Sequence, residues 1–595
     1  MRAGPSELIS IHAQMARGDI AGALRRVQEI TQSETESASA HHLAGVVFRR
    51  AGLLEQAVQA LSKARDLGLD NAEICNSLAL TLQELGRPEE ALRAFDAAMA
   101  LDPDYEPALV NRARLLAENG NYGSAETVLR DWLARKPASL LARNALAATL
   151  REAGRGRAAE REYAEVLARD PTNATAAVCR GQVLRDLGAN AEALDHFRHA
   201  SPGHTHLPEF AESLAGALLA SGDLTGAREI LVRLTETAPA YLRGHRALAR
   251  LTREYGTDDD PYRSYRALVA RWPGEAVIWR DWMALALSFR EFALVGDLVR
   301  EAERHLGSDP ALVFAAAIAS SERGEAQAAE ALFDRSEGAL AGRTDFLSAR
   351  ARNALRLREP KRAEKLAGEI TRREPLNQFG WGYLGLAWRL LEDEREFWLH
   401  DYARQTAQIA LPELADAGAR EEFCRILRRL HSARHHPPDQ TLRGGTQTEG
   451  ALFLLEDSAI ARLREAIRRA LRGFIAGLPE DDLHPFYSRR RADVRFIGSW
   501  SVRLTGEGYH IAHLHEQGWI SSALHLVLPQ AGGDDEAGKL VLGEPPEELE
   551  LGLPPRRVIE PRAGSLVLFP SSMWHGTRKF AAGERLTVAF DAVPA

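Results

Sequence analysis

The residues best suited to chemistry lie in two short stretches near the C-terminal end of this 595-residue chain. His513 and His515 stand two positions apart in YHIAHLH, and His575 follows in MWHGT. Residues two apart in a β-strand point to the same face, so the first two imidazoles can share one metal ion. Imidazole suits iron, zinc, copper and nickel alike, so the residue types predict a metal site without naming the metal.

Arg585 and Thr587 follow His575 at ten and twelve positions, in the stretch RLTVAF. If this stretch is a strand, both side chains lie on one face. A guanidinium presents a planar fork that fits a carboxylate, and a hydroxyl adds one more donor. Each charge-assisted hydrogen bond of this kind contributes on the order of 1.5–3 kcal/mol. Arg585 and Thr587 together could therefore bind the distal carboxylate of a small dicarboxylate.

The elements that must position these residues begin near residue 493. Stretches such as VRFIGSWSVRL, WISSALHLVLP, GSLVLFP and RLTVAFDAV are rich in β-branched and aromatic residues and are separated by Gly and Pro. About seven or eight such strands over roughly 100 residues predict a double-sheet jelly roll, with Gly564 turning the chain into one of them.

These residues resemble the Fe(II)/2-oxoglutarate-dependent oxygenases, over about residues 436–595. The resemblance is carried by WHGT followed by ERLTVAFD, where a basic residue comes about ten positions after a distal histidine. It implies a double-stranded β-helix fold and Fe(II) with 2-oxoglutarate as co-substrate. It also implies O2, with succinate and CO2 formed as a substrate C–H bond is hydroxylated. His513, His575 and Arg585 would be the catalytic residues, and Arg585 and Thr587 would bind 2-oxoglutarate.

One position departs from that family. Its usual proximal motif is His-x-Asp/Glu, and here His515 stands where the carboxylate is expected. Three arrangements stay open. His513, His515 and His575 form a three-His metal face; or two histidines bind and water or chloride fills the third place, as in some β-hydroxylases and halogenases of the family; or Glu516 swings in, although strand alternation points it away.

Several neighbours are candidates for the pocket wall. Tyr509 shares strand parity with His513, and Trp500, Arg503 and Trp519 are candidates for substrate contact, with core packing the alternative for the two tryptophans. His525 alternates with apolar residues in SSALHLVLP, so we expect it in the core or behind the metal ligands.

The first two-thirds of the chain repeats with a fixed period. Glycine recurs every 34 residues, at positions 18, 52, 86, 120, 154, 188, 222 and 256. An alanine follows five residues after all but the last of these, and the register resumes at Gly324. Glycine ends one helix where the backbone needs a positive φ, and the small residues let paired helices approach closely.

The period and these positions resemble tetratricopeptide repeats. The resemblance implies an α-solenoid whose groove binds a protein or peptide partner. Residues 256–310 depart from the pattern and are interpreted as irregular repeats, a packing surface or a bend. A single helical hairpin cannot bury its own apolar face, so the units must stack.

These patterns predict a multidomain chain: a helical repeat array over 1–410, a linker over 411–450 and the jelly roll over 451–595. The linker contains His435 and His436 beside two prolines, where a solvated loop is the simplest interpretation. Apolar residues at helical spacing from Ile460 to Phe474 predict an amphipathic helix on the outside of the sheet.

The composition limits the partners. The net charge is −8 and the isoelectric point about 6.2, which argues against a general nucleic-acid binder. The three cysteines, Cys75, Cys179 and Cys424, are far apart, so we expect buried thiols rather than disulfides or a zinc site. No secretory signal or run of 18 apolar residues is evident, so we expect no membrane contact and a cytoplasmic location.

The most direct hypothesis is an Fe(II)/2-oxoglutarate-dependent hydroxylase acting on a protein or peptide that the repeat array recruits. Two alternatives remain open from the sequence. One is a non-catalytic interaction scaffold with a degenerate jelly roll, motivated by His515. The other is a three-His dioxygenase that does not use 2-oxoglutarate.

Overall fold

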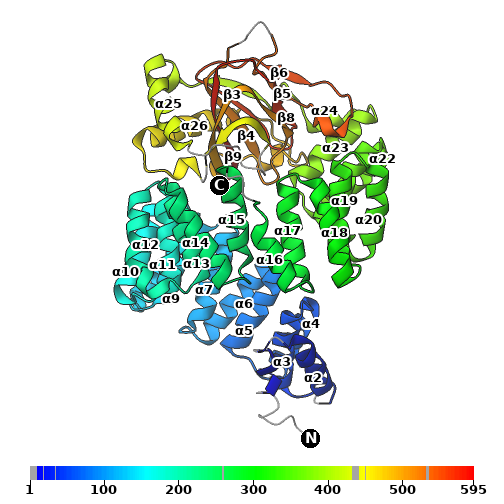
Figure 1. Cartoon of the computed structure of the whole chain (residues 1–595). Helices are drawn as coiled ribbons and strands as arrows, with labels where there is room; N and C mark the ends of the chain where they lie inside the picture. The colour runs from blue at the N-terminus through cyan, green and yellow to red at the C-terminus, as the bar shows by residue number, and fades with distance from the viewer. Residues whose placement is uncertain are drawn as a thin grey trace. The chain divides into compact units, whose positions relative to one another are not determined.

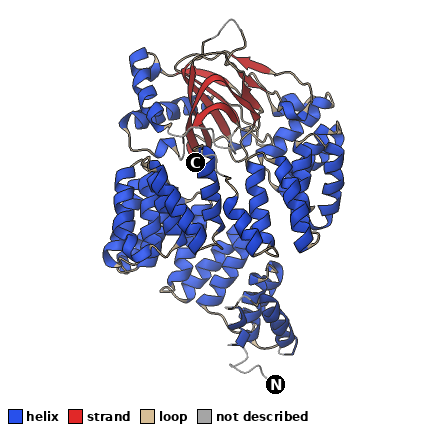
Figure 2. Ribbon diagram, in the orientation of Figure 1, coloured by secondary structure: helices blue, strands red, loops and turns tan. Residues whose placement is uncertain are grey.

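A computed structural model describes residues 10–11, 13–15, 17, 19–33, 35–256, 260–431, 441–448, 451–530 and 535–595. Gly18, His435 and His436 lie outside the described residues. The chain divides into two compact units, residues 1–184 with 196–204 and residues 185–195 with 205–595. Helices fill the first unit, whereas the second combines helices with a β-sheet (Figures 1 and 2).

Antiparallel helix pairs form the first unit and continue across its boundary. Their bounds are α2 (Ile20–Ser33), α3 (Ala38–Arg50), α4 (Leu54–Asp66), α5 (Ala72–Glu84), α6 (Pro88–Leu101), α7 (Glu106–Glu118), α8 (Tyr122–Arg135), α9 (Leu140–Glu152), α10 (Gly156–Arg169), α11 (Ala174–Asp186) and α12 (Asn190–His204). The alanines that follow the repeat glycines, such as Ala57 and Ala91, are fully buried. The predicted close approach of paired helices is therefore present.

The same pairing continues in the second unit. Its array helices are α13 (Pro208–Ala220), α14 (Leu224–Thr237), α15 (Leu242–Glu254), α16 (Arg263–Arg271), α17 (Ala276–Ser288), α18 (Phe292–Leu306), α19 (Pro310–Glu322), α20 (Ala326–Leu340), α21 (Thr344–Arg356), α22 (Pro360–Arg373), α23 (Gln378–Leu390) and α24 (Arg395–Leu399). The irregular stretch from 256 to 310 is explained by α16, which has nine residues. Aromatic packing fills that place, with Tyr265 stacked on Trp282 at 5.9 Å between ring centroids.

The left-handed turn between paired helices persists where glycine is absent. Gly86 and Gly324 have φ of 71° and 82°, as predicted for a helix C-cap. Arg290 and Arg358 occupy the same 34-residue register with φ of 58° and 60°. A left-handed conformation costs a non-glycine residue about 1–2 kcal/mol, so the repeat geometry is kept at these positions against local preference.

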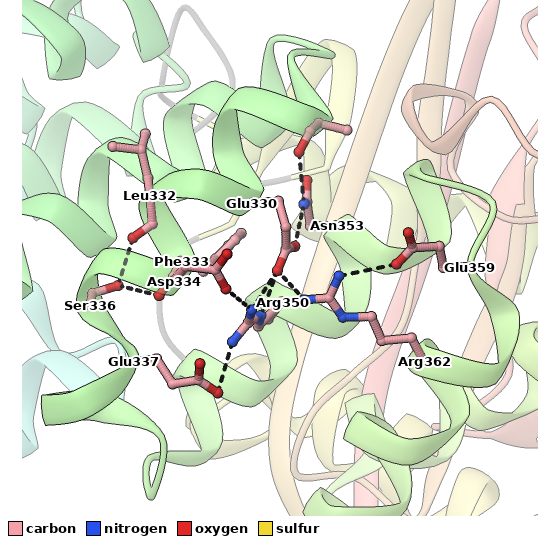
Figure 3. Close-up of polar contacts among 11 residues, drawn as sticks. Glu330, Leu332, Phe333, Asp334, Ser336, Glu337, Arg350, Asn353, Glu359 and Arg362 are labelled. Carbon is pink, nitrogen blue, oxygen red and sulfur yellow. Dashed lines mark hydrogen bonds and ion pairs between the residues drawn. The ribbon is translucent and has the colours of Figure 1, made fainter.

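An ion-pair network centred on the buried Arg350 joins α20, α21 and α22 (Figure 3). The Arg350 side chain is 7% exposed; its Nε donates to Glu330 at 2.8 Å and its Nη1 lies 3.0 Å from Glu337. Asp334 also accepts from Arg350, and Arg362 donates to Glu330. Shared carboxylates compensate the buried guanidinium, so the network fixes the register of the three helices.

Nine of the described strands form one curled antiparallel sheet, the jelly roll that the sequence predicts. Their order is β1-β7-β4-β9-β3-β8-β5-β6, and β2 pairs with β3. The strands are β1 (Ala407–Ala410), β2 (Leu442–Gln447), β3 (Val494–His513), β4 (Ile520–Val527), β5 (Leu540–Leu542), β6 (Arg557–Ile559), β7 (Ser565–Pro570), β8 (His575–Thr577) and β9 (Glu584–Pro594). Short 3-10 turns lie between them, at η1 (Pro412–Leu414), η2 (Leu452–Leu454), η3 (Tyr487–Arg489) and η4 (Glu547–Leu549).

The long strand β3 belongs to both halves of the sheet. Its first part pairs with β9 as far as Thr505, and its last part pairs with β8, where His513 faces His575. The change of partner falls at GEG, where Glu507 has a φ of 64°. The bend carries the C-terminal end of β3 from one half of the sheet to the other.

The two faces of β9 have different roles. Leu586, Val588 and Phe590 belong to an apolar core shared with α25 (Ala417–Leu430) and α26 (Ser458–Ala476). The alternate residues, Arg585 and Thr587 among them, point to the opposite, inner face. Helix α26 is the predicted amphipathic helix, and its buried stripe packs on the outside of the sheet.

The structure differs from the predicted linker over 411–450. β1 pairs with β7, α25 packs Phe423 and Leu427 into the core under the sheet, and β2 pairs with β3. The described part of this segment therefore belongs to the sheet domain, which begins near Ala407. The sequence did not predict these strands because β1 has only four residues and β2 is rich in glycine, so neither shows clear alternation of apolar and polar residues. Their pairing partners also lie far along the chain.

Cys75 and Cys424 are buried free thiols and Cys179 is half-buried and free. No helix in the described ranges combines the length and apolar character that crossing a membrane requires.

His431 links α25 to two strands and predicts a pH-dependent stability. Its ring nitrogens lie 2.8 Å from Thr446 Oγ1 and 3.1 Å from Ser501 Oγ. Burial, with a smaller effect from Arg503, lowers the pKa of His431 to about 4. Its unfolded pKa is about 6.5, so the unfolded state takes up the proton first as pH falls. The stabilisation is complete above about pH 6.5 and is lost as pH falls towards 4.

We expect the melting temperature to fall between about pH 7 and pH 5. Glutamine does not titrate, so the melting temperature of His431→Gln should fall less steeply with pH. Differential scanning calorimetry measures this. His206→Gln, at an exposed position, is the matched control and should keep the wild-type slope. Equal slopes for all three proteins would contradict this role of His431.

Candidate metal centre and active site

Three histidines meet inside the curled sheet. One ligand atom from each of His513, His515 and His575 lies within 4.8 Å of the other two. The ring centroids of His513 and His575 are 4.3 Å apart, and His515 is 5.1 Å from each. This spacing suits three donors around one ion.

Paired strands position two of these rings, and the segment after β3 positions the third. His513 is the last residue of β3 and pairs with His575, the first residue of β8. His515 lies two residues beyond the strand, where its amide donates to Ser571 O at 3.2 Å. Strand alternation, from which the shared face of His513 and His515 was predicted, therefore does not place His515; a turn held against Ser571 does.

The Nδ1 atom of each of the three rings makes a hydrogen bond. His513 Nδ1 lies 2.8 Å from Ile511 O, and His575 Nδ1 lies 3.0 Å from Met573 O. His515 Nδ1 lies 2.6 Å from the Asp591 carboxylate. All three partners accept hydrogen bonds, so each Nδ1 carries the proton. Each Nε2 is thereby left with its lone pair, which is the form that binds a metal.

Asp591 is a functional candidate that the sequence reasoning missed. It is 8% exposed, and its second oxygen accepts from Ser521 Oγ at 2.6 Å. Three neutral imidazoles leave the whole charge of a divalent ion on the site, and Asp591 supplies a negative charge one hydrogen bond away. The signal was available in the sequence, because Asp591 shares the strand parity of Arg585 and Thr587 in RLTVAFDAV.

Burial keeps two of the three rings, His513 and His575, neutral. Burial lowers the pKa of His513 to about 3, with a smaller effect from His515. Burial also holds the pKa of His575 well below its usual value. Neutral imidazole is the ligand form, so these rings need not lose protons to bind a metal near neutral pH. The donor set therefore fits an imidazole-preferring transition metal such as Fe(II).

Arg585 is a buried cation without a counter-ion in the described part of the chain. Its side chain is 2% exposed, and Nε has no hydrogen-bond partner. Burial lowers its pKa to about 10, which still leaves it charged at neutral pH. An uncompensated buried charge costs several kcal/mol, so this arrangement fits a site that binds an anion.

Polar side chains that hold no counter-charge surround the guanidinium. Thr587 is buried and pairs across the sheet with His525. Neither ring nitrogen of His525 has a described partner, and burial, with the charge of Arg585, lowers its pKa to about 3. Burial and Arg585 also depress the pKa of His510, which the sequence reasoning left out. A carboxylate bound here would contact the Arg585 guanidinium and the Thr587 hydroxyl, beside neutral imidazole rings.

A cleft of about 860 Å³ opens beside the triad. Its sheet-domain wall includes His513, His515 and Trp500, whose ring stacks on His515 at 5.6 Å. Its opposite wall includes Arg290 and Phe379 from the repeat array of the same unit. A molecule reaching the histidines through this cleft meets both kinds of surface.

The other residues that the sequence suggested for the pocket wall make contacts of their own. Lys579 covers the ring of Tyr509 at 4.7 Å, and Arg503 donates to Glu584 at 2.6 Å. Trp519 is buried and donates to Phe486 O, which is core packing. Glu516 is exposed at the cleft, outside the three-histidine cluster.

Comparison with protein families identifies both parts of the chain. Residues 498–591 match the family described as "Putative 2OG-Fe(II) oxygenase". Residues 11–72, 82–149 and 144–203 match tetratricopeptide repeat families. The protein therefore joins tetratricopeptide repeats to a C-terminal domain that matches this 2OG-Fe(II) oxygenase family, which confirms both resemblances seen in the sequence.

Solved structures of tetratricopeptide repeat proteins match part of this chain. A tetratricopeptide repeat protein from Parabacteroides merdae is 21% identical, with a TM-score of 0.34, over 42% of this chain and 98% of its own. A thermophilic repeat protein from Thermus thermophilus is 25% identical, with a TM-score of 0.26, over 30% of this chain and 98% of its own.

The pairing of Asp591 with His515 predicts a measurable effect on metal binding. Asp591→Asn keeps the side-chain shape but removes the charge that holds the His515 Nδ1–H. We expect affinity for Co(II), titrated into the metal-free protein, to fall roughly 10- to 100-fold. Asp493→Asn, at an exposed position, is the matched control and should leave affinity unchanged. Wild-type affinity in Asp591→Asn would exclude this role.

Proposed function

We propose that this protein is an Fe(II)/2-oxoglutarate-dependent oxygenase that hydroxylates a protein or peptide substrate recruited by the repeat array. The observation that carries the proposal is Arg585. A buried cation with no described counter-ion stands in the same sheet interior as three convergent imidazoles. A metal site alone needs no such cation, whereas a dicarboxylate co-substrate does.

The residue roles follow from these positions. His513, His515 and His575 would hold Fe(II) through Nε2, with their tautomers set by Ile511 O, Asp591 and Met573 O. When bound, Fe(II) would activate O2, the oxidant, and couple the oxidative decarboxylation of 2-oxoglutarate to succinate and CO2 with hydroxylation of a substrate C–H bond.

The chain's own contribution is to bind, orient and exclude water. Arg585 and Thr587 would bind the carboxylate of 2-oxoglutarate that lies away from the metal. Phe569, fully buried and 4.6 Å from the His575 ring, would keep water from that side. Desolvation strengthens the contact between Arg585 and the carboxylate, because the effective dielectric is lower inside the sheet.

Access through the cleft supports a substrate that the array helps to bind. Leu287, Arg290 and Phe379 of the array face the same cleft as His513 and His515. An extended peptide side chain entering there would touch array residues as it reached the metal site. Arg290 is paired with Glu548 at 2.9 Å, so the cleft presents a compensated charge rather than a strongly basic surface.

A second function is favoured by one observation. His515 joins the other two histidines, as a three-His dioxygenase that does not use 2-oxoglutarate would require. Arg585 distinguishes the two, because only the 2-oxoglutarate enzyme gives that cation a ligand.

The proposal predicts succinate formation that depends on Fe(II), 2-oxoglutarate and Arg585. Arg585→Ala should raise the KM for 2-oxoglutarate roughly 10- to 150-fold, the equivalent of about 1.5–3 kcal/mol for a charge-assisted contact. His575→Ala should abolish turnover. Succinate is measured by mass spectrometry, and Arg429→Ala, exposed on α25, is the matched control. O2 consumption that requires His575, needs no 2-oxoglutarate and is unchanged in Arg585→Ala would favour the dioxygenase without 2-oxoglutarate.

The class of substrate is tested separately. Iron-loaded wild-type protein and His575→Ala are incubated with the same lysate, 2-oxoglutarate and O2, and peptides are compared by mass spectrometry. We expect one or a few peptides to gain an oxygen with the wild type alone. Phe379→Ala, which alters the array wall of the cleft, should reduce that gain more than it reduces substrate-free succinate formation. Oxygen found only on small molecules would contradict a protein substrate.

A further inference from the structure

The residues next to the metal-binding histidines are anchored outside the sheet's own core. Leu514 stands between His513 and His515, and Trp574 precedes His575. Both are buried, and both belong to an apolar cluster built mainly by helices α21 to α24 of the array. The histidines thus point into the sheet while their chain neighbours point into the last repeat.

Helix α23 touches both ligand-bearing segments at one glycine. Gly382 O accepts a hydrogen bond from Trp574 Nε1 at 3.1 Å. A Cβ at Gly382 would lie 2.2 Å from Leu514 Cδ2, 3.3 Å from Ser572 O and 3.4 Å from Trp574 Nε1. Glycine is unfavourable inside a helix, and here the close approach of the two segments accounts for it.

Two further contacts lie on either side of this glycine. Gln378 N, at the start of α23, donates to Glu516 O at 3.2 Å, one residue after His515. His400, just after α24, lies 3.0 Å from Ser572 Oγ, and both side chains are buried. The segment after β3 and the segment before β8 are therefore each held at two points by the end of the array.

The Nδ1 hydrogen bonds of two ligand rings stay within their own segments and do not join one segment to the other. His513 and His575 are bonded through Nδ1 to carbonyls of their own segments, at Ile511 and Met573. Helices α25 and α26 pack on the far face of the sheet. Across the triad, the strand pairing, Ser571, Asp591 and the end of the array determine where the ligands stand.

We propose that helix α23 is a positioning element of the metal centre. The positioning residues are Gly382, on α23, and Trp574, which precedes β8 and packs against α23. The inference rests on the proposed metal site. Contact between α23 and the turns carrying Leu514 and Trp574 sets the separation of the two ligand segments together with the pairing of β3 and β8. Metal affinity depends on such preorganisation, because ligands held in place lose less freedom on binding. The array is therefore part of the metal site as well as of the cleft.

The test compares Co(II) binding and the visible spectrum of the Co(II)-loaded full-length protein across variants. Gly382→Ala should bind Co(II) at least tenfold more weakly, with a changed visible spectrum. Trp574→Phe, which removes the bond to Gly382 O and keeps an aromatic ring, should show a smaller loss. Gly368→Ala, on α22 with no neighbour within 4 Å of the added methyl, is the matched control and should match the wild type.

A compensating change separates positioning from general damage. Alanine favours helix over glycine, so the metal-free Gly382→Ala protein should keep its helical circular dichroism. Leu514→Ala in the Gly382→Ala background makes room for the methyl and should recover most of the Co(II) affinity and the wild-type spectrum. That recovery would show that the spacing of the segments is what the added methyl disturbs.

The outcomes are distinct. Wild-type affinity and spectrum in both Gly382→Ala and Trp574→Phe would overturn the inference and leave the proposed function standing. Should Gly382→Ala fail to fold, wild-type behaviour of Trp574→Phe alone overturns it. Absence of Co(II) binding by the wild-type protein overturns the inference together with the metal site on which it rests.

Discussion

The antiparallel pairing of His513 with His575 is the constraint on which the site depends. Facing residues in such a pair have Cβ atoms about 4.5–5.5 Å apart, so two imidazoles are within reach of one ion before any metal binds. β3 pairs with β9 as far as Thr505 and with β8 from His510, and Glu507 between them has a φ of 64°. His515 then joins from a turn, and Asp591 on β9 holds its ring.

The sheet interior has an uneven distribution of charge. Asp591 and Arg585 lie six positions apart on one face of β9, and the buried histidines between and around them are neutral. Asp591 has hydrogen-bond donors in His515 and Ser521, whereas Arg585 has no described partner. A cation left in this state lowers the stability of the free protein, and an anionic ligand offsets that cost. Stability and ligand binding are therefore coupled through Arg585.

Arginines of the array also join it to the sheet domain, by donating to loop carbonyls. Arg358 donates to Leu551 O at 2.9 Å and Arg389 to Gly543 O at 2.7 Å. Arg358 occupies a repeat position that usually holds glycine, so its left-handed backbone is accepted where its side chain binds the loop near η4. Such directional contacts orient the last repeats, which then supply a wall of the cleft and the support for Leu514 and Trp574.

The sequence by itself determined the elements and the directions of many side chains. The 34-residue period predicts stacked helix pairs, and alternation in RLTVAFDAV places Arg585 and Thr587 on one face, because both depend on neighbours a few residues away. The tertiary structure alone decided where His515 lies, that Asp591 binds it, that residues 407–431 and 441–448 belong to the sheet domain and that Leu514 packs on Gly382. These contacts join segments far apart in the chain, and local periodicity carries no information about which distant segments meet.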